Sequence, residues 1–395
     1  MINYRNINDN KVAFKKLIDF DFGRADYNED IVINCHDGQR KLMYTVIEFY
    51  TELSKHFDLN DLLVVYIGSA GGFHAPIIFD MFPQLKYYFV DPAPFFIKHK
   101  IVNTDRLVLA NDFYDDNYYK KIKEFNKENR KIVFVSDIRV DPNEKDVMRD
   151  MLNQQKWCIQ LNSIAYLFKF RLPWDREHKI FKYLKGNIYR QIYSPRKSTE
   201  TRLMGIRTHD EPFMFVYYNV TDYDNAMFYY NYKVRRSKTE FLNSSEMKYH
   251  ILGYDDSYES VTEYHLVYNY LKDFNKTMYD NTKFKSSTLE QKTIILLQDI
   301  NKRLIKLTNK PLVDCKYKMY LKRRKQIKNN PKFSKVYSSF KDETKLYREQ
   351  LVSSLKKQLE FLEESKSNPK KRILEIKDYD EQIKRGQGIL VKIQQ

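Results

Sequence analysis

Glycine and acidic residues follow several apolar runs of this sequence, at places where a cofactor could bind. The segment 65–74, Val-Tyr-Ile-Gly-Ser-Ala-Gly-Gly-Phe-His, lies where an apolar run gives way to a helical pattern. Gly68, Gly71 and Gly72 allow the backbone to turn sharply there and to approach a ligand. Turns of this kind bind many nucleotides, and some bind none. A phosphate-binding P-loop is excluded because its Gly-Lys-Ser/Thr ending is missing.

Two aspartates end the next apolar runs. Asp91 follows the glycine segment by about 20 residues, where an acidic side chain accepts both hydroxyls of an adenosine ribose. Asp137 stands in Ser-Asp-Ile-Arg at the end of a later run. Ligands of open parallel sheets bind beyond the carboxyl ends of the strands, so Gly68, Asp91 and Asp137 are expected to converge on one crevice. Dinucleotide and S-adenosylmethionine proteins share this pattern, although the Gly-x-Gly-x-x-Gly spacing of an NAD-linked oxidoreductase is absent.

A parallel sheet flanked by helices would position these residues. Unbroken apolar runs predict buried strands at 62–68, 85–91, 107–110 and 131–137. Helical patterns alternate with them at 39–50, 73–82, 117–128 and 148–155. Segments 157–162 and 212–218 are expected as later strands, the second antiparallel at an edge, and 289–307 as an amphipathic helix. The predicted fold class is α/β, with a mainly parallel sheet flanked by helices.

Positive charge is concentrated in two stretches. Of the net charge of +17, residues 301–395 carry +15. The sequence therefore predicts three regions: an N-terminal segment and helix (1–60), a core (61–310) and a basic, helical tail (311–395). Residues 169–207 carry +8 and interleave these charges with aromatics, namely Phe170, Trp174, Tyr183, Tyr189 and Tyr193. Such a mixture suits a sugar-phosphate backbone with stackable bases, or equally a solvated surface whose aromatics enter the core.

Several classes of protein do not fit the composition. No run of about 18 apolar residues exists, and the N-terminus lacks the pattern of a secretion signal. The three cysteines are scattered and lack the spacing of a zinc site. We expect no membrane segment, no metal and no disulfide, and a cytoplasmic protein.

Four charged residues are informative when they are taken as a set. Lys41, Asp137, Lys169 and Glu200 are singly typical of surface charge, but in this order they resemble the Lys-Asp-Lys-Glu tetrad of ribose 2'-O-methyltransferases. The surrounding sequence resembles the poxvirus cap-specific mRNA 2'-O-methyltransferases, which double as poly(A) polymerase processivity subunits. The likeness covers roughly residues 17–310 and lies in five segments: 38–42, 64–70, 135–139, 169–173 and 199–203.

This resemblance implies a Rossmann-like methyltransferase fold with S-adenosyl-L-methionine as methyl donor. It implies that the donor is surrounded by Gln39, Tyr66, Gly68, Gly72, His74, Asp91, Tyr114, Asp137 and Arg139. It also implies an m7G cap pocket built from Phe22, Trp174, Asp175, Lys197 and Asp224. The chain departs from the family at Gly71, where the family has Pro, at 92–93, where a basic residue is replaced, and at Lys197, where an aromatic is expected.

The implied reaction explains the residue types. A ribose 2'-hydroxyl is a poor nucleophile that must be aligned and partly deprotonated. Lys169 is the candidate base; a lysine serves as one only when burial and nearby cations, here Lys41 and Arg139, lower its pKa. Two functions stay open: an active cap methyltransferase, or an RNA-binding processivity subunit with reduced or no activity. The implied partners are m7G-capped mRNA and a poly(A) polymerase catalytic subunit, in a host cytoplasm or virion.

Overall fold

The chain divides into two compact units. The computed structural model describes residues 37–174, 179–195, 198–208, 211–232, 234–236, 250–254, 257–274, 287–308, 311–329 and 339–395. With these gaps, the first unit takes in 39–191 and 198–231, and the second takes in 37–38, 192–195 and 232–395. The boundaries predicted from the sequence, at 60 and 310, stay predictions.

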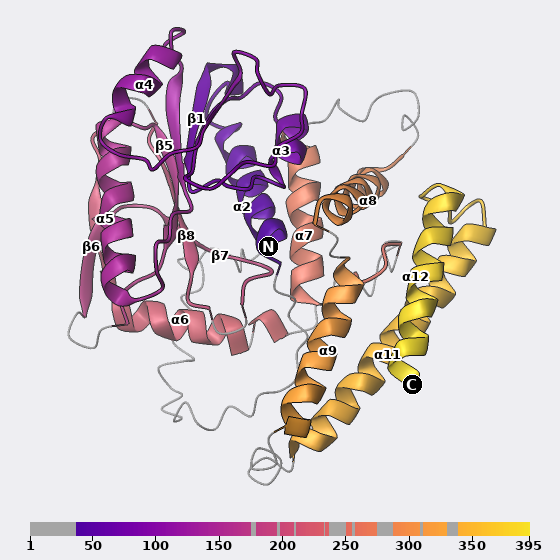
Figure 1. The fold of residues 1–395 in the computed structure, drawn as a ribbon. Helices are drawn as coiled ribbons and strands as arrows, with labels where there is room; N and C mark the ends of the chain where they lie inside the picture. Colours follow the sequence, from indigo (N-terminus) through magenta and orange to yellow (C-terminus); the bar gives the residue numbers. More distant parts are fainter. Residues whose placement is uncertain are drawn as a thin grey trace. The chain divides into compact units, whose positions relative to one another are not determined.

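The first unit is built on a seven-stranded sheet (Figure 1). Its strand order is β3-β2-β1-β4-β5-β8-β7. Strands β1 to β5 are parallel, β8 is antiparallel to β5, and β7 is antiparallel to β8. The strands are β1 (Leu62–Ile67), β2 (Lys86–Val90), β3 (Leu107–Ala110), β4 (Lys131–Ser136), β5 (Ala165–Phe170), β7 (Asn187–Arg190) and β8 (Thr201–Ile206). Every residue of β1 and β2 is buried, as expected of strands covered on both faces.

Helices cover both faces of this sheet. In Figure 1, α4 and α5 lie on one face and α2 and α3 on the other. The elements are α2 (Gly38–Leu53), the short η2 (Leu59–Asp61), α3 (Ala75–Met81), α4 (Tyr118–Phe125), α5 (Glu144–Gln160) and α6 (Val220–Tyr232). The predicted α/β class with a mainly parallel sheet is confirmed.

One predicted strand is wrong. Residues 157–160 form the last turn of α5, and β5 begins only at Ala165. The helix buries Val147, Met151, Trp157 and Cys158, a helical spacing that the short apolar run at its end concealed.

The predicted strand at 212–218 exists but lies outside the main sheet. Here β9 (Phe215–Asn219) pairs antiparallel with β6 (Ile180–Leu184) as a two-stranded ribbon. The antiparallel pairing is therefore confirmed, but the predicted place at an edge of the main sheet is wrong.

The second unit is helical. It contains η3 (Val234–Arg236), α7 (Tyr258–Asn269), a π-helical turn η5 (Tyr270–Phe274), α8 (Leu289–Thr308), α9 (Leu312–Asn329), α11 (Ser339–Ser367) and α12 (Ile376–Gln394). Gln358 of α11 accepts from Gly253 N at 3.0 Å, and Gln382 of α12 donates to His250 O at 3.2 Å. The described parts of the basic tail, 311–329 and 339–395, are therefore mainly helical. Side chains of α11 and α12 form hydrogen bonds with the segment 250–254. Among the described residues, no helix is long and apolar enough to cross a membrane.

Candidate active site

The glycine segment and Asp137 meet at the carboxyl ends of β1 and β4. These strands are neighbours, with Ile67 opposite Ser136. Gly68 has φ 73°, and a Cβ there would lie 2.7 Å from Ile138 N and 2.8 Å from the carbonyl carbon of Asp137. Glycine is therefore required at position 68 for the loop after β1 to lie against the loop after β4.

Asp91 ties the glycine loop to the end of β2. Its Oδ2 accepts from Ala70 N at 2.9 Å, and its Oδ1 accepts from Ala93 N at 2.8 Å. Each carboxylate oxygen has more than one acceptor site, so both can accept a further hydrogen bond. Gly68, Asp91 and Asp137 therefore lie on neighbouring loops at the carboxyl ends of the strands, as the sequence predicted.

A steric contact accounts for Gly71, which stands where the related family has Pro. Phe96 packs against this residue, and a Cβ at position 71 would lie 2.7 Å from the Phe96 ring. Phe73 stacks on Phe96 with ring centroids 5.4 Å apart, and Phe96 N donates to Gly71 O at 2.9 Å. An aromatic pair therefore supports the loop where the family's proline would clash.

His74 begins α3 and contacts α2. Its Nδ1 lies 2.9 Å from Oε1 of Gln39, and the side chain is buried. Burial lowers the pKa of His74 to about 4, although the Asp137 carboxylate acts in the opposite direction. His74 is therefore neutral at pH 7, where it can take part only in uncharged hydrogen bonds.

The buried His74 should make stability depend on pH. Between pH 6.5 and 4 the unfolded chain binds a proton at this position that the folded protein does not, so stability falls as pH falls. Urea unfolding at pH 7 and pH 5 should show that wild type loses about 2 kcal/mol more than His74→Gln. His56→Gln, at an exposed histidine, is the control. Equal losses for wild type and His74→Gln would contradict the burial of a neutral histidine.

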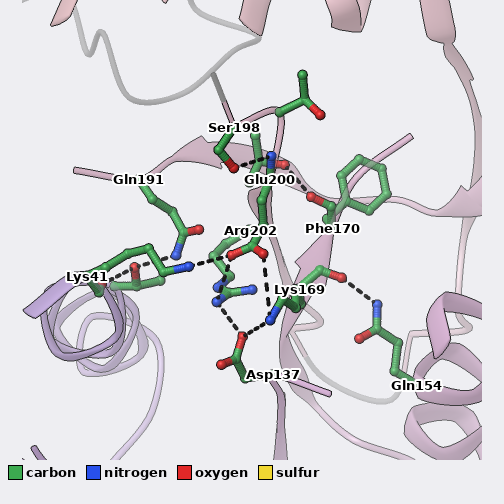
Figure 2. Close-up of polar contacts among 12 residues, drawn as sticks. Lys41, Asp137, Gln154, Lys169, Phe170, Gln191, Ser198, Glu200 and Arg202 are labelled. Carbon is green, nitrogen blue, oxygen red and sulfur yellow. Dashed lines mark hydrogen bonds and ion pairs between the residues drawn. The ribbon is translucent and has the colours of Figure 1, made fainter. Parts of the chain in front are cut away.

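The four charged residues of the predicted tetrad lie together, as Figure 2 shows, beside the glycine loop that follows β1. Lys41 Nζ donates to Glu200 Oε1 at 2.6 Å. Lys169 Nζ lies 3.2 Å from Asp137 Oδ1 and 3.6 Å from Glu200 Oε2. They come from α2, from β5, from the turn after β4 and from the residue before β8. Two ammonium and two carboxylate groups therefore form one continuous cluster.

The structure adds a fifth charge, Arg202. Its Nη2 lies 2.5 Å from Asp137 Oδ1 and 3.5 Å from Glu200 Oε1, and its side chain is 2% exposed. Arg202 is the direct cross-strand partner of Lys169, a like-charge pair that would be unfavourable without the two carboxylates. Its position two residues after Glu200, on the same face of the strand, was the available sequence signal.

Gln191 is a further residue of this cluster that the sequence did not indicate. With its amide oriented to satisfy its neighbours, it donates to Glu200 Oε1 at 3.1 Å and accepts from Arg202 Nε at 3.1 Å. It therefore fixes the carboxylate and the guanidinium relative to each other.

The cluster is buried, and its charges shift one another's pKa. Burial alone would raise the pKa of the Glu200 carboxyl, but Lys41, Arg202 and Lys169 outweigh it, so this pKa lies well below its usual range. The pKa of Asp137 is lowered in the same way, against burial, by Arg202 and the lysines. Burial lowers the pKa of Lys41 despite the opposing effect of Glu200. Both carboxylates are thus ionised at neutral pH.

The other predicted donor-site residues lie on the same unit. Tyr66 is a buried residue of β1, and Gly72 has φ 65°. Tyr114 follows β3 and Arg139 follows β4. The Tyr114 hydroxyl and Arg139 Nη1 are buried without a hydrogen-bond partner among the residues that the structure describes. They are polar groups that a ligand could satisfy.

On the predicted cap side, the structure describes Trp174 and Asp224. Trp174 is 57% exposed, and the Arg171 guanidinium lies 4.3 Å from its ring centroid. Its Nε1 donates to Thr199 Oγ1 at 3.0 Å, and Tyr223, the neighbour of Asp224 in α6, donates to Thr199 O. Thr199 thus links Trp174 to Tyr223, the residue before Asp224. Phe22, Asp175 and Lys197 lie outside the described residues. No group of three or more potential metal ligands occurs in the described part of the chain.

Comparison with known proteins decides the family. The family model described as "Poly A polymerase regulatory subunit" matches residues 13–305. The chain belongs to this family. The resemblance identified from the sequence is thereby confirmed.

Two proteins similar to this chain come from poxviruses. A Fowlpox virus (strain NVSL) protein is 26% identical over 295 residues, which is 70% of this chain and 89% of the relative. A Myxoma virus (strain Lausanne) protein is 27% identical over 266 residues, or 64% of this chain and 72% of the relative. Both are named cap-specific mRNA (nucleoside-2'-O-)-methyltransferase.

Among solved structures, bluetongue virus VP4, described as a multifunctional RNA-capping production line, has a TM-score of 0.38 and 12% identity. The match covers 52% of this chain and 33% of VP4, so it spans about a third of that protein.

Proposed function

We propose that this protein transfers a methyl group from S-adenosylmethionine to the ribose 2'-hydroxyl of the first transcribed nucleotide of m7G-capped RNA. The observation that carries this proposal is the cluster of Lys41, Asp137, Lys169 and Glu200 beside the glycine loop (Figure 2). The names of the relatives and the family match support it.

The residues present fit the proposed donor. Asp91 retains acceptor capacity on both oxygens, which suits a ribose diol. The Tyr114 hydroxyl and Arg139 Nη1 have no hydrogen-bond partner among the described residues, although Arg139 Nη1 lies 3.8 Å from Asp150 Oδ2, and both suit further polar groups. Gly68 and Gly72 have positive φ, so the loop backbone can turn sharply at both positions. When bound, S-adenosylmethionine would supply an electrophilic methyl group on its sulfonium.

The charge of the cluster suits activation of a hydroxyl. Among the residues that the structure describes, Lys41, Lys169 and Arg202 form ion pairs with two carboxylates, Asp137 and Glu200, so a fully protonated cluster of these five groups has one positive charge in excess. A neutral amine at the cluster can accept the 2'-hydroxyl proton. We assign the role of proton acceptor to Lys169 because its Nζ is held between Asp137 and Glu200.

Cap recognition would rest on Trp174. Because Arg171 covers one face of the indole, one open face remains for a base. Methylated guanine is cationic and gains cation–π energy that neutral guanine lacks, on the order of 1 kcal/mol. This difference would favour methylated caps.

A second function is supported by the family description. A subunit that holds RNA for a poly(A) polymerase needs positive charge on its surface, and α9 presents Lys318, Lys322, Arg324 and Lys325 to solvent. The two functions are compatible in one chain, and the same assay separates them.

The decisive experiment supplies m7G-capped RNA and S-adenosylmethionine labelled in its methyl group. Label is expected on the ribose of the first nucleotide after nuclease digestion. S-adenosylhomocysteine together with a cap dinucleotide should also raise the thermal stability of the protein. Label on a base would refute the proposed site of methylation, and RNA binding without transfer would favour the processivity function alone.

A further inference from the structure

The ribbon of β6 and β9 has one buried face and one exposed apolar face. Tyr183 and Tyr218 point inward and lie 5.7 and 5.4 Å from the Phe170 ring, measured between centroids. The outward residues of the alternating pattern are unusually exposed for their type. Ile180 is 60%, Phe215 42% and Tyr217 71% exposed. A contiguous apolar surface of this kind on a folded unit indicates a binding face.

Positive charge accompanies these side chains. Lys182 lies opposite Tyr217 in the ribbon, and its Nζ lies 5.6 Å from the Phe215 ring centroid and 5.9 Å from that of Tyr217. Lys179 and Lys185, at either end of β6, are also exposed. Segments 179–187 and 214–219 contain no Asp or Glu. The face therefore combines two exposed aromatic rings with Lys182, and Lys179 and Lys185 flank it at the two ends of β6.

The structure also answers a question that the basic, aromatic stretch 169–207 left open. Of its aromatics, Phe170, Tyr183, Tyr189 and Tyr193 are buried and not available for stacking, whereas Trp174 is exposed. Lys182 of β6 is instead combined with the exposed rings of β9, a strand outside that stretch. The pairing of β6 with β9, and not the local sequence, thus brings a lysine beside exposed aromatic rings.

We propose that this ribbon face, formed by Ile180, Lys182, Phe215 and Tyr217, binds single-stranded RNA. Bases stack on exposed aromatic rings, and lysines neutralise the adjoining phosphates. A protein partner is less suited because interface cores are depleted in lysine. The proposal rests on the proposed function only for its ligand, since a capped transcript continues beyond the cap as single-stranded RNA.

Binding of an uncapped, unstructured RNA of about 20 nucleotides to the full-length protein tests the proposal without the cap pocket. Replacing both rings, Phe215→Ala with Tyr217→Ala, should weaken binding at least about 10-fold, because each stacked base contributes about 1–3 kcal/mol. The double variant Phe215→Trp with Tyr217→Trp should restore it. Lys182→Ala should reduce the slope of log affinity against log salt by about 0.7.

A matched control removes exposed apolar surface elsewhere on the same unit. Leu152→Ala with Ile159→Ala, on α5, should leave RNA affinity unchanged. Methyl transfer to a capped dinucleotide should be unchanged in the ring variants, so failure of the ribbon proposal and failure of the methyltransferase proposal give different results. Equal RNA affinity of the alanine variant and wild type would overturn the proposal. Loss of polymerase binding with RNA affinity intact would also overturn it and assign the face to a protein.

Discussion

Lys169→Ala is expected to lower methyl transfer to capped RNA by about 10²- to 10⁴-fold, the usual contribution of a positioned general base. Lys169 Nζ lies between Asp137 and Glu200, and its side chain is only 13% exposed, so solvent cannot easily replace it. Capped-RNA binding should change little, because the remaining cluster keeps two cations. Single-turnover rates at saturating donor, with capped-RNA affinity measured in parallel, check this result.

Two further variants sharpen the test. Lys169→Arg keeps the positive charge but places there a group that is not deprotonated in proteins, so a proton-accepting role predicts nearly the same loss as Lys169→Ala. Lys120→Ala, at an exposed lysine of α4, is the control and should be fully active. Retention of more than about a tenth of the wild-type rate by Lys169→Arg would mean that Lys169 acts only through its charge.

Arg202→Leu is expected to lower the free energy of unfolding by about 3–5 kcal/mol, the usual effect of removing one partner from a buried ion pair. Arg202 is 2% exposed and bonds Asp137, so its loss leaves a buried carboxylate with less compensation. Urea unfolding at pH 7 measures the effect. Arg149→Leu, which removes a 49% exposed arginine paired with Asp146, should cost no more than about 1 kcal/mol.

The effect of Arg202→Leu should depend on pH in a defined direction. The pKa values of Glu200 and Asp137 lie below their unfolded values of 4.5 and 3.8, so the stability that they contribute is present above this range and lost as pH falls below it. The gap between wild type and Arg202→Leu should therefore be widest near neutrality and narrow below about pH 4. A gap that stays constant from pH 7 to pH 3 would mean that Arg202 stabilises the fold by packing alone.

The sequence by itself determined the parallel strands, the glycine turn and the acids that end the strands. Each of these is a local property: an unbroken apolar run can be buried only between two layers, and Gly68 is needed wherever the backbone has positive φ. The tetrad was also found from the sequence, although only through its likeness to a family. Nothing in the spacing of Lys41 and Glu200 indicates that they touch.

Only the tertiary structure decided which distant groups meet. Lys41 and Glu200 are 159 residues apart and bond at 2.6 Å because α2 packs against the sheet in which β8, the strand after Glu200, lies. Arg202 became part of the cluster through its cross-strand position opposite Lys169. Local patterns also could not separate the helical end of α5 from a strand, or the buried Tyr183 from the exposed Tyr217, since burial depends on partners that other segments supply. The energy of each such contact is shared between remote parts of the chain, so neither part encodes it alone.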